Sequence, residues 1–326
     1  MIEVVAPGLY STIQDRGRSG FYALGIPPSG AMDRFAHDAA NALVGNSPEA
    51  AGIETTFLGP TLRFGAFTVV AVTGADVTVT LDGVRVPLWM SQVVRAGQTL
   101  QFGTTRSGAR AYLAVRGGVD VPPVMGSRST YVTSGLGGLQ GRALQSGDVL
   151  TVGHLLIPGT EPRGGVAVPD DLVPTYPTDL EIRVVPGLCD YRLTPESVRH
   201  LYSEPYGVTI ESNRTGYRLS GRPLEFVGRE APFGAGADPS NVVNLGYPVG
   251  SIQVPSGTEL ICLLRDAVTG GGYATVGTVI SADLDLLAQA KSPDRVRFIP
   301  VSVDVALAER STRAQRLQRI TWVATR

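Results

Sequence analysis

Lysine is nearly absent from this chain. Lys291 is the one lysine, whereas the 326 residues include 27 arginines. A phosphate-binding loop of the Walker A type needs Gly-Lys-Ser/Thr, whereas Lys291 lies in AQAKSPD behind Ala290. Schiff-base and serine/lysine chemistry needs a buried lysine of lowered pKa, and we expect Lys291 at a water-exposed helix end before Ser292-Pro293. The sequence therefore excludes a P-loop ATPase and leaves arginine, backbone amides and hydroxyls to bind anionic groups.

Cysteine and histidine are also scarce. Cys189 and Cys262 are far apart, and neither has a second cysteine nearby to form a zinc knuckle or a redox pair, so we expect both to be reduced and structural. The histidines His37, His154 and His200 are not accompanied by a GxSxG elbow or by HxH or HxxxH spacing. We therefore predict neither a Ser-His-Asp site nor a metal site.

Long apolar runs and blocks of positive charge are missing as well. The net charge is −1 and the pI about 6.3, so the basic surface expected of a nucleic-acid-binding protein is absent. The N-terminus MIEVVAPGLYSTIQD has no basic region followed by an apolar segment, and the longest apolar run, residues 67–75, is far below the roughly 18 residues of a membrane span. We expect a cytoplasmic protein that binds neither nucleic acid nor membrane.

Short strands separated by turns are the main pattern that is present. VTVTLDGVRV alternates apolar and polar residues on both sides of Asp82-Gly83, which predicts a hairpin with a type I′ turn. Further strands are predicted among turns rich in the 40 glycines and 23 prolines, at residues 67–72, 111–115, 148–152, 180–185, 259–264, 276–280 and 296–303. Many short strands with few helices favour barrels or sandwiches.

Four helices are predicted from capping residues. We expect Asp33, Asp283 and Asp304 to cap three of them, and Thr194-Pro195-Glu196 to open the fourth. The first should end at Gly45-Asn46. The last should run through the arginine-rich tail.

The segment GLGGLQGR, residues 135–142, superficially matches a dinucleotide-binding loop. Its third glycine is misplaced, and LQSGDVLTV follows where a helix should begin, so we reject a nucleotide site there. A proline-rich stretch predicts an interdomain linker. We predict an N-terminal β domain over residues 1–157, a linker over 158–178 and a C-terminal β domain over 179–326.

Three polar, glycine-rich segments are the candidates for binding or catalysis. In the first, IQDRGRSG leads into PPSGAMD, where backbone amides after Ser29-Gly30 and the positive end of the following helix are suited to a carboxylate or carbonyl oxygen. In the second, ESNRTGYRLSG, Asn213 offers a two-sided amide and Arg214 a forked guanidinium. In the third, LLRDAVTGGGY, an apolar strand ends in Arg265-Asp266, and three glycines allow a ligand to approach the backbone.

Each segment has a structural alternative, namely a helix cap, a salt bridge in a turn or a tight loop. Asp266 in particular is as well explained by a pair with Arg265 or another arginine as by a catalytic base. Because all three segments lie at the ends of predicted strands, we expect them to share one cleft.

The chain resembles a known family at these segments and at several others. The family is variously named allophanate hydrolase subunit 2, KipI antagonist and the C subunit of 5-oxoprolinase. The matching runs, in order and with fitting spacing, are QDRGRSG, PPSGAMD, ANALVGN, AYLAVRGGVDVPPVMGSRSTY, SNRTGYRLSG, GSIQVPSG and TGGGYATVGTVISADL.

The resemblance implies two β-barrel-type domains with a few short helices, the C-terminal one cyclophilin-like, which agrees with the mainly β reading. It also implies half of the carboxyltransferase part of a urea carboxylase, and a complex with a subunit 1 (KipI-type) homologue, expected as a heterotetramer. Biotin is carried on a lysine between two methionines, and Lys291 lies between Ala290 and Ser292. The chain thus binds no cofactor through a motif of its own, and ATP, with biotin if it is used, falls to partner subunits.

We assign the site residues as follows. Asp266, Arg214 and Asn213 are predicted to be catalytic, with Asp266 as a base or an amide-orienting carboxylate. The predicted substrate-binding residues are Asp15, Ser29, Asp33, Gln253, Gly271, Gly272 and Tyr273.

Two function classes stay open. The first is an enzyme subunit, inactive alone, for ATP-dependent amide chemistry: opening of the lactam 5-oxoproline, or carboxyl transfer to a urea-like amide. The second is a non-catalytic regulatory binding protein of the KipI-antagonist type. Leu245 and Val268 stand where the family often has polar side chains, and this favours the second class somewhat.

Overall fold

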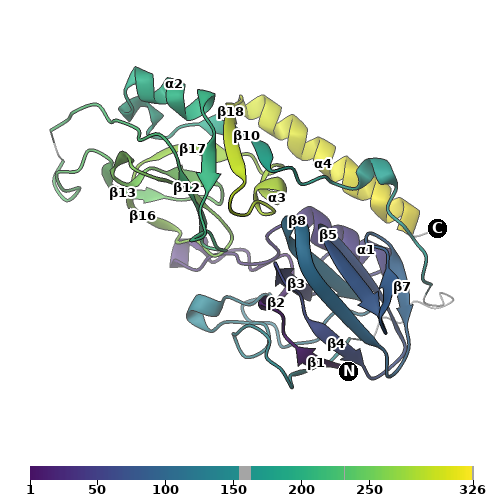
Figure 1. Cartoon of the computed structure of the whole chain (residues 1–326). Helices are drawn as coiled ribbons and strands as arrows, with labels where there is room; N and C mark the ends of the chain where they lie inside the picture. The colour runs from purple at the N-terminus through teal and green to yellow at the C-terminus, as the bar shows by residue number, and fades with distance from the viewer. Residues whose placement is uncertain (154–162, 231, 325–326) are drawn as a thin grey trace. The chain divides into compact units, whose positions relative to one another are not determined.

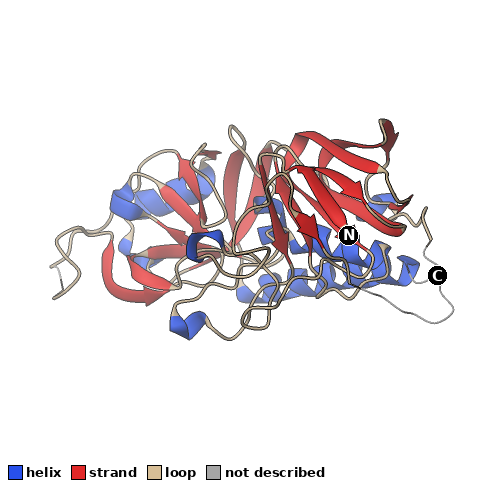
Figure 2. Cartoon of the chain, turned by 90° about the horizontal axis from the view of Figure 1, so that it is seen from below, coloured by secondary structure: helices blue, strands red, loops and turns tan. Residues whose placement is uncertain are grey.

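The computed structural model describes residues 1–153, 163–230 and 232–324. The chain divides into two compact units. The first comprises Met1–Arg18, Ser29–Tyr176 and Ala314–Arg326, and the second comprises Ser19–Pro28 and Pro177–Arg313. Strands dominate both units, as Figure 2 shows in red, so the prediction of a mainly β protein is confirmed.

A curled sheet forms the first unit, with nine strands among the described residues. The strand order is β2-β3-β8-β4-β1-β9, and β5 pairs with β6, β7 and β8. These strands are β1 (Ile2–Ala6), β2 (Tyr10–Gln14), β3 (Gly52–Thr56), β4 (Thr61–Phe64), β5 (Thr68–Leu81), β6 (Val84–Val86), β7 (Ser91–Val94), β8 (Thr99–Val115) and β9 (Val149–Leu150).

The long strands β5 and β8 lie side by side and carry the core of this unit (Figure 1). Successive side chains of a strand point to opposite faces, so Val70 and Val72 enter one buried cluster while Val69 and Ala71 enter another. Helix α1 (Arg34–Leu43) packs on β5 and β8 and contributes to the second cluster. The sheet is therefore covered on both faces.

A closed seven-stranded barrel forms the second unit within the described residues, in the order β10-β17-β14-β15-β12-β11-β18. β10 pairs in parallel with β18, and alternate side chains of β10 (Leu180, Ile182, Val184) are buried. A two-stranded ribbon, β13-β16, completes the unit. The strands are β10 (Asp179–Pro186), β11 (Tyr206–Val208), β12 (Gly216–Ser220), β13 (Asn241–Gly246), β14 (Ser251–Gln253), β15 (Leu260–Leu263), β16 (Gly270–Tyr273), β17 (Thr275–Val279) and β18 (Arg295–Pro300).

Local sequence signals determined several elements correctly. β5 and β6 form the predicted hairpin, with Asp82 and Gly83 both at positive φ as a type I′ turn requires. The predicted strands at 67–72 and 77–81 are, however, one continuous strand, because β8 supplies a partner along nearly its whole length. Both cysteines are free and buried.

The helices show where capping signals were right and wrong. Asp33 caps α1 by accepting a hydrogen bond from the Ala36 amide, and Thr194 caps α2 (Pro195–Ser203) in the same way. Asp283 does not cap α3 (Leu284–Leu287) with its side chain, because that carboxylate accepts hydrogen bonds from Arg183 instead.

The C-terminal helix also departs from the prediction. α4 (Val303–Ala324) begins one residue before Asp304, and the Ser302 hydroxyl accepts the Val305 amide, so Ser302 rather than Asp304 is the capping residue. With 22 residues, α4 is not short. Lys291 is partly buried, and its backbone amide donates to Asp294 in a turn beyond α3.

The predicted linker is only partly described, and its first residues, together with His154, lie outside the described ranges. The rest contains a short 3₁₀ helix, Asp170–Leu172, and buries Val168 and Leu172 in the core of the first unit. The domain bounds 1–157 and 179–326 stay predictions. None of the described helices is both long and apolar enough to span a membrane.

Candidate functional site

Two of the predicted catalytic residues meet in the second unit. Arg214 donates to Asp266 from Nε (2.7 Å) and Nη2 (3.2 Å), and the two side chains are 6% and 7% exposed. The β12–β15 register causes this pairing: Gly216 lies opposite Leu263, so the turn before β12 reaches the residues after β15. The backbone adds a hydrogen bond from the Asp266 amide to the Arg214 carbonyl.

A bidentate guanidinium–carboxylate pair has two chemical consequences. It holds the guanidinium plane in one orientation, and it places two charges where removal of either leaves the other buried without compensation. This is the structural alternative that the sequence left open for Asp266, now with Arg214 as the partner. The same two hydrogen bonds also hold the Asp266 carboxylate in one position, as a carboxylate that orients a substrate requires.

Asn213 serves its own turn. Its side-chain oxygen accepts the Thr215 amide at 2.8 Å and the Gly216 amide at 3.4 Å. Asparagine commonly stabilises turns in this way. The acceptor side of the amide is thus occupied, and contact with a substrate would fall to the amino group.

The three glycines after Asp266 form strand β16 rather than an open loop. Leu245 of β13 lies opposite Gly271, and an added Cβ at Gly271 would lie 3.0 Å from the Tyr247 ring. The Tyr247 hydroxyl donates to the Tyr273 carbonyl (2.9 Å) and accepts the Tyr273 amide (2.7 Å). Glycine at position 271 therefore lets an aromatic ring of the chain itself pack closely against the backbone.

Gln253 and Tyr273 also belong to this neighbourhood. Burial raises the pKa of Tyr247. It outweighs hydrogen bonds that lower this pKa, one of which is with the Gln253 side chain. Tyr273 is 43% exposed, and Leu245 packs beside the buried cluster of Tyr247, Leu263 and Ala267. The second and third polar segments, with Gln253, thus come together in one unit.

Asp15, in the first unit, is the centre of a different network. Its carboxylate accepts hydrogen bonds from the Ser127 and Ser129 hydroxyls (2.7 and 2.5 Å) and from the Gly17 and Arg128 amides (2.7 and 2.6 Å). Burial acts to raise the pKa of Asp15, but these four donors outweigh it, and the pKa is lowered. A carboxylate with this many internal donors holds its loops together.

Ser29 and Asp33 lie in the same unit, where the amides after Ser29-Gly30 already have acceptors. The Ala31 amide donates to the Asp15 carbonyl, the Met32 amide to Glu54 and the Asp33 amide to the Tyr112 hydroxyl. An anion bound here would have to displace one of them. Ser29 is fully buried at φ 51°, and its hydroxyl has no hydrogen-bond partner among the described residues.

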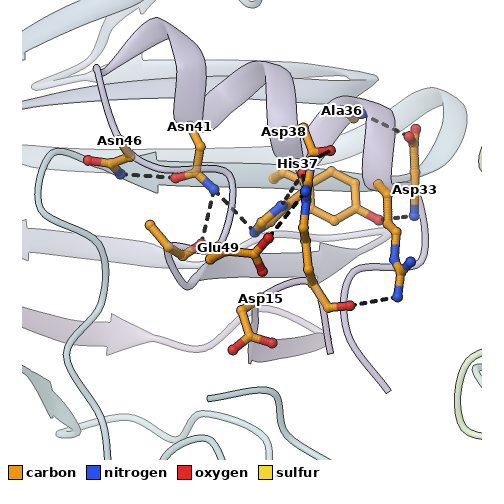
Figure 3. Close-up of polar contacts among 12 residues, drawn as sticks. Asp15, Asp33, Ala36, His37, Asp38, Asn41, Asn46 and Glu49 are labelled. Carbon is orange, nitrogen blue, oxygen red and sulfur yellow. Dashed lines mark hydrogen bonds and ion pairs between the residues drawn. The ribbon is translucent and has the colours of Figure 1, made fainter. Parts of the chain in front are cut away.

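Helix α1 carries a third polar cluster, which the sequence did not predict (Figure 3). His37 Nδ1 lies 3.3 Å from Asp38, and its Nε2 lies 3.3 Å from the Asn41 amide nitrogen. Asp38 also accepts two hydrogen bonds from Arg16. His37 is 2% exposed, so its ring is enclosed by the protein.

The sequence missed several partners that complete these networks. Tyr247, Ser127, Ser129 and Asp38 were not selected, although GSRST, which holds both serines, is among the family-like runs. The expected cleft shared by all three segments stays a prediction. No group of three His, Cys, Asp or Glu side chains in the described ranges is placed to hold a metal ion.

The Asp15 network predicts acid sensitivity. Because its folded-state pKa is lowered, Asp15 stabilises the fold above its ordinary pKa near 3.8, and this stability is lost as pH falls through the folded value. Asp15→Asn should cost about 2–3 kcal/mol at neutral pH, since an amide cannot accept all four donors. Thermal denaturation from pH 7 down to 3 should show a shallower acid loss in this variant.

The control for this experiment is Asp120→Asn, which removes an exposed carboxylate of the same unit. It should leave the melting temperature and its pH dependence nearly unchanged. Equal melting curves for wild type and Asp15→Asn at both ends of the pH range would contradict the stabilising role of Asp15.

Comparison with known proteins adds three findings. The family described as carboxyltransferase domain, subdomain A and B, matches residues 24–300. The C subunit of the 5-oxoprolinase of Escherichia coli is 35% identical over 99% of this chain and 98% of its own length. The urea amidolyase of Saccharomyces cerevisiae is 36% identical over 93% of this chain, which spans only 17% of that protein.

A solved structure agrees with these matches. The K. lactis urea amidolyase superposes with a TM-score of 0.92 at 34% identity, covering 98% of this chain and 20% of that one. The chain thus spans a small part of the urea-processing relatives, and nearly all of the bacterial protein.

Proposed function

Because this chain belongs to the family of carboxyltransferase domains, subdomains A and B, we propose that it is one subunit of a hetero-oligomeric, ATP-dependent enzyme that processes a small amide or lactam. The near-complete match to the C subunit of a 5-oxoprolinase carries the proposal, since it covers both proteins almost from end to end. The reaction we favour is opening of the lactam ring of 5-oxoproline. Carboxyl transfer to a urea-like amide, suggested by the urea amidolyase relatives, is the second reaction that fits this family.

The proposed active-site half lies in the second unit, around Arg214 and Asp266. Asp266 holds the guanidinium in one plane through two hydrogen bonds, and a fixed guanidinium is suited to a carbonyl or carboxylate oxygen of the substrate. Asn213 would contact the substrate amide. Gln253, Gly271, Gly272 and Tyr273 are its proposed substrate-binding residues. Asp15, Ser29 and Asp33 belong to the first unit and stay proposed as substrate-binding residues there.

ATP and, if it is used, biotin are proposed to be handled by other subunits. The chain has no phosphate-binding loop, and its one lysine lacks the flanking methionines of a biotin carrier. We propose a subunit 1 homologue as the partner, in two copies of each chain, and the cytoplasm as the location.

Co-expression with a subunit 1 homologue tests the partnership. We expect a stable complex of two copies of each chain by size-exclusion chromatography with light scattering, and no 5-oxoproline-dependent ATP hydrolysis by this chain alone. Elution of the co-expressed pair as separate monomers would refute the partnership.

A regulatory role is the second candidate. Arg214 and Asp266 neutralise each other, and Leu245 packs in an apolar cluster where the family often has a polar residue. A sequestering protein of the KipI-antagonist type would need no catalytic residues. It would bind its partner with the same affinity after Asp266→Asn, and no ATP hydrolysis would depend on its presence.

A further inference from the structure

A pocket in the second unit shares no lining residue with the Arg214–Asp266 pair. Its volume is about 400 Å³, within the range usual for small-ligand sites. The short 3₁₀ helix Asp190–Arg192, the segment after Phe226 and strand β13 form its walls.

Two arginines line this pocket and lie close together. Arg192 Nη1 and Arg229 Nη2 both donate to the carbonyl oxygen of Asn241, at 2.9 and 2.6 Å. Because both nitrogens donate to the same oxygen atom, the two guanidinium groups lie close to each other. Arg192 also donates to the Pro239 carbonyl and lies over the Phe226 ring, with 5.9 Å between the guanidinium carbon and the ring centre. Both guanidinium groups are thus held in place by the backbone.

No carboxylate in the described part of the chain forms an ion pair with either of these arginines. This holds although Asp190 and Glu230 are close in sequence to Arg192 and Arg229. Nε of Arg229 is buried and has no hydrogen-bond partner in the described ranges. Two neighbouring cations without an anion repel each other, and a buried cationic donor without an acceptor costs free energy. Both costs fall if an anion binds.

The rest of the pocket wall is apolar. Val227, Val242 and Val243 line it together with Pro232 and Tyr191. Val227, Val243 and Tyr191 are 51%, 60% and 77% exposed, which is high for such side chains. An inorganic anion would lose hydration against this wall without compensation, whereas an apolar group would gain by covering it.

From the paired arginines and the apolar wall, we propose that this pocket binds a small organic monocarboxylate with a compact apolar body. The carboxylate accepts hydrogen bonds from Arg192 and Arg229, because its two oxygens match the guanidinium fork. The apolar body covers Val227 and Val243. This site is additional to the proposed function and does not depend on it.

Benzoate is the probe for this site, measured by calorimetry and thermal shift on the isolated chain. Benzoate should bind and raise the melting temperature, while benzamide, which has the same ring without the charge, and sulfate, which has the charge without the ring, should bind at least tenfold more weakly. Arg229→Gln should weaken benzoate binding at least tenfold. Arg229 is chosen because its backbone contact is with one carbonyl, whereas Arg192 contacts two.

The matched control is Arg222→Gln, which removes a half-exposed arginine of the same unit that pairs with Glu196. It should bind benzoate as the wild type does. Absence of benzoate binding to the wild type, or equal affinity in Arg229→Gln, would overturn the proposal. The experiment measures benzoate binding to the chain alone. Its outcome is therefore independent of partner assembly and of ATP hydrolysis.

Discussion

Replacing Asp266 with asparagine is expected to lower turnover of the proposed enzyme complex by about a hundredfold or more. The substitution nearly preserves shape but removes the charge that fixes Arg214, at 2.7 and 3.2 Å. Removing one partner of a buried ion pair leaves the other charge buried without compensation, so a lower melting temperature is also expected. The measurement is 5-oxoproline-dependent ATP hydrolysis, taken well below the melting temperature so that only folded protein is compared.

A second ion pair of the same unit supplies the control. Arg183 donates two side-chain hydrogen bonds to Asp283, which is 7% exposed. Asp283→Asn should therefore lower the melting temperature in a similar way and leave turnover unchanged. If Asp266→Asn behaves like Asp283→Asn, the Arg214–Asp266 pair is structural only.

Arg214→Lys examines the other partner. Lysine keeps the charge but loses the two-pronged geometry, so we expect at least a tenfold loss in kcat/KM, about 1.4 kcal/mol or more. Normal kcat/KM in this variant would make Arg214 a turn residue that serves the fold alone.

Gly137→Ala is expected to destabilise the first unit by about 2–5 kcal/mol, the sum of a backbone cost and a steric cost. Gly137 has φ +65°, and an added Cβ would clash with the Ser129 carbonyl oxygen and lie 2.9 Å from the Arg18 side chain. The left-handed backbone costs an ordinary residue about 1–2 kcal/mol, and an extra methyl group in tight packing costs about 1–3 kcal/mol more. Because Ser129 also donates to Asp15, the carboxylate network is disturbed as well.

Gly135→Ala separates the two contributions in the same loop. Gly135 has nearly the same φ, +63°, but an added Cβ there has nothing within 4 Å. Gly135→Ala should lower the free energy of unfolding only by the backbone contribution, about 1–2 kcal/mol. Chemical denaturation of the three proteins measures the difference, and equal stability of the two variants would exclude the steric clash with Ser129. The GLGGLQGR run, rejected as a nucleotide loop, would then have no packing role at Gly137.

The sequence alone determined the features that depend on neighbouring residues. Asp82-Gly83 was sufficient for the hairpin, because positive φ at two successive positions is a local property. Asp33 and Thr194 were sufficient for two helix starts, since a cap bonds an amide a few residues away. The excess of short strands also predicted the mainly β class. Asn213, Arg214 and Asp266 were each selected as chemically suitable side chains, one residue at a time.

Only the tertiary structure decided which of these side chains meet. Arg214 reaches Asp266 through the β12–β15 register, and Asp15 finds Ser127 and Ser129 more than a hundred residues away. The glycines after Asp266 became a strand because β13 pairs with them and Tyr247 packs on Gly271. Asp283 and Asp304 have side chains that are suited to helix capping. However, the Asp283 carboxylate accepts hydrogen bonds from Arg183, and the Ser302 hydroxyl accepts the amide at the start of α4. Register and long-range pairing depend on the free energy of the whole sheet or barrel, and no local pattern of residues contains that information.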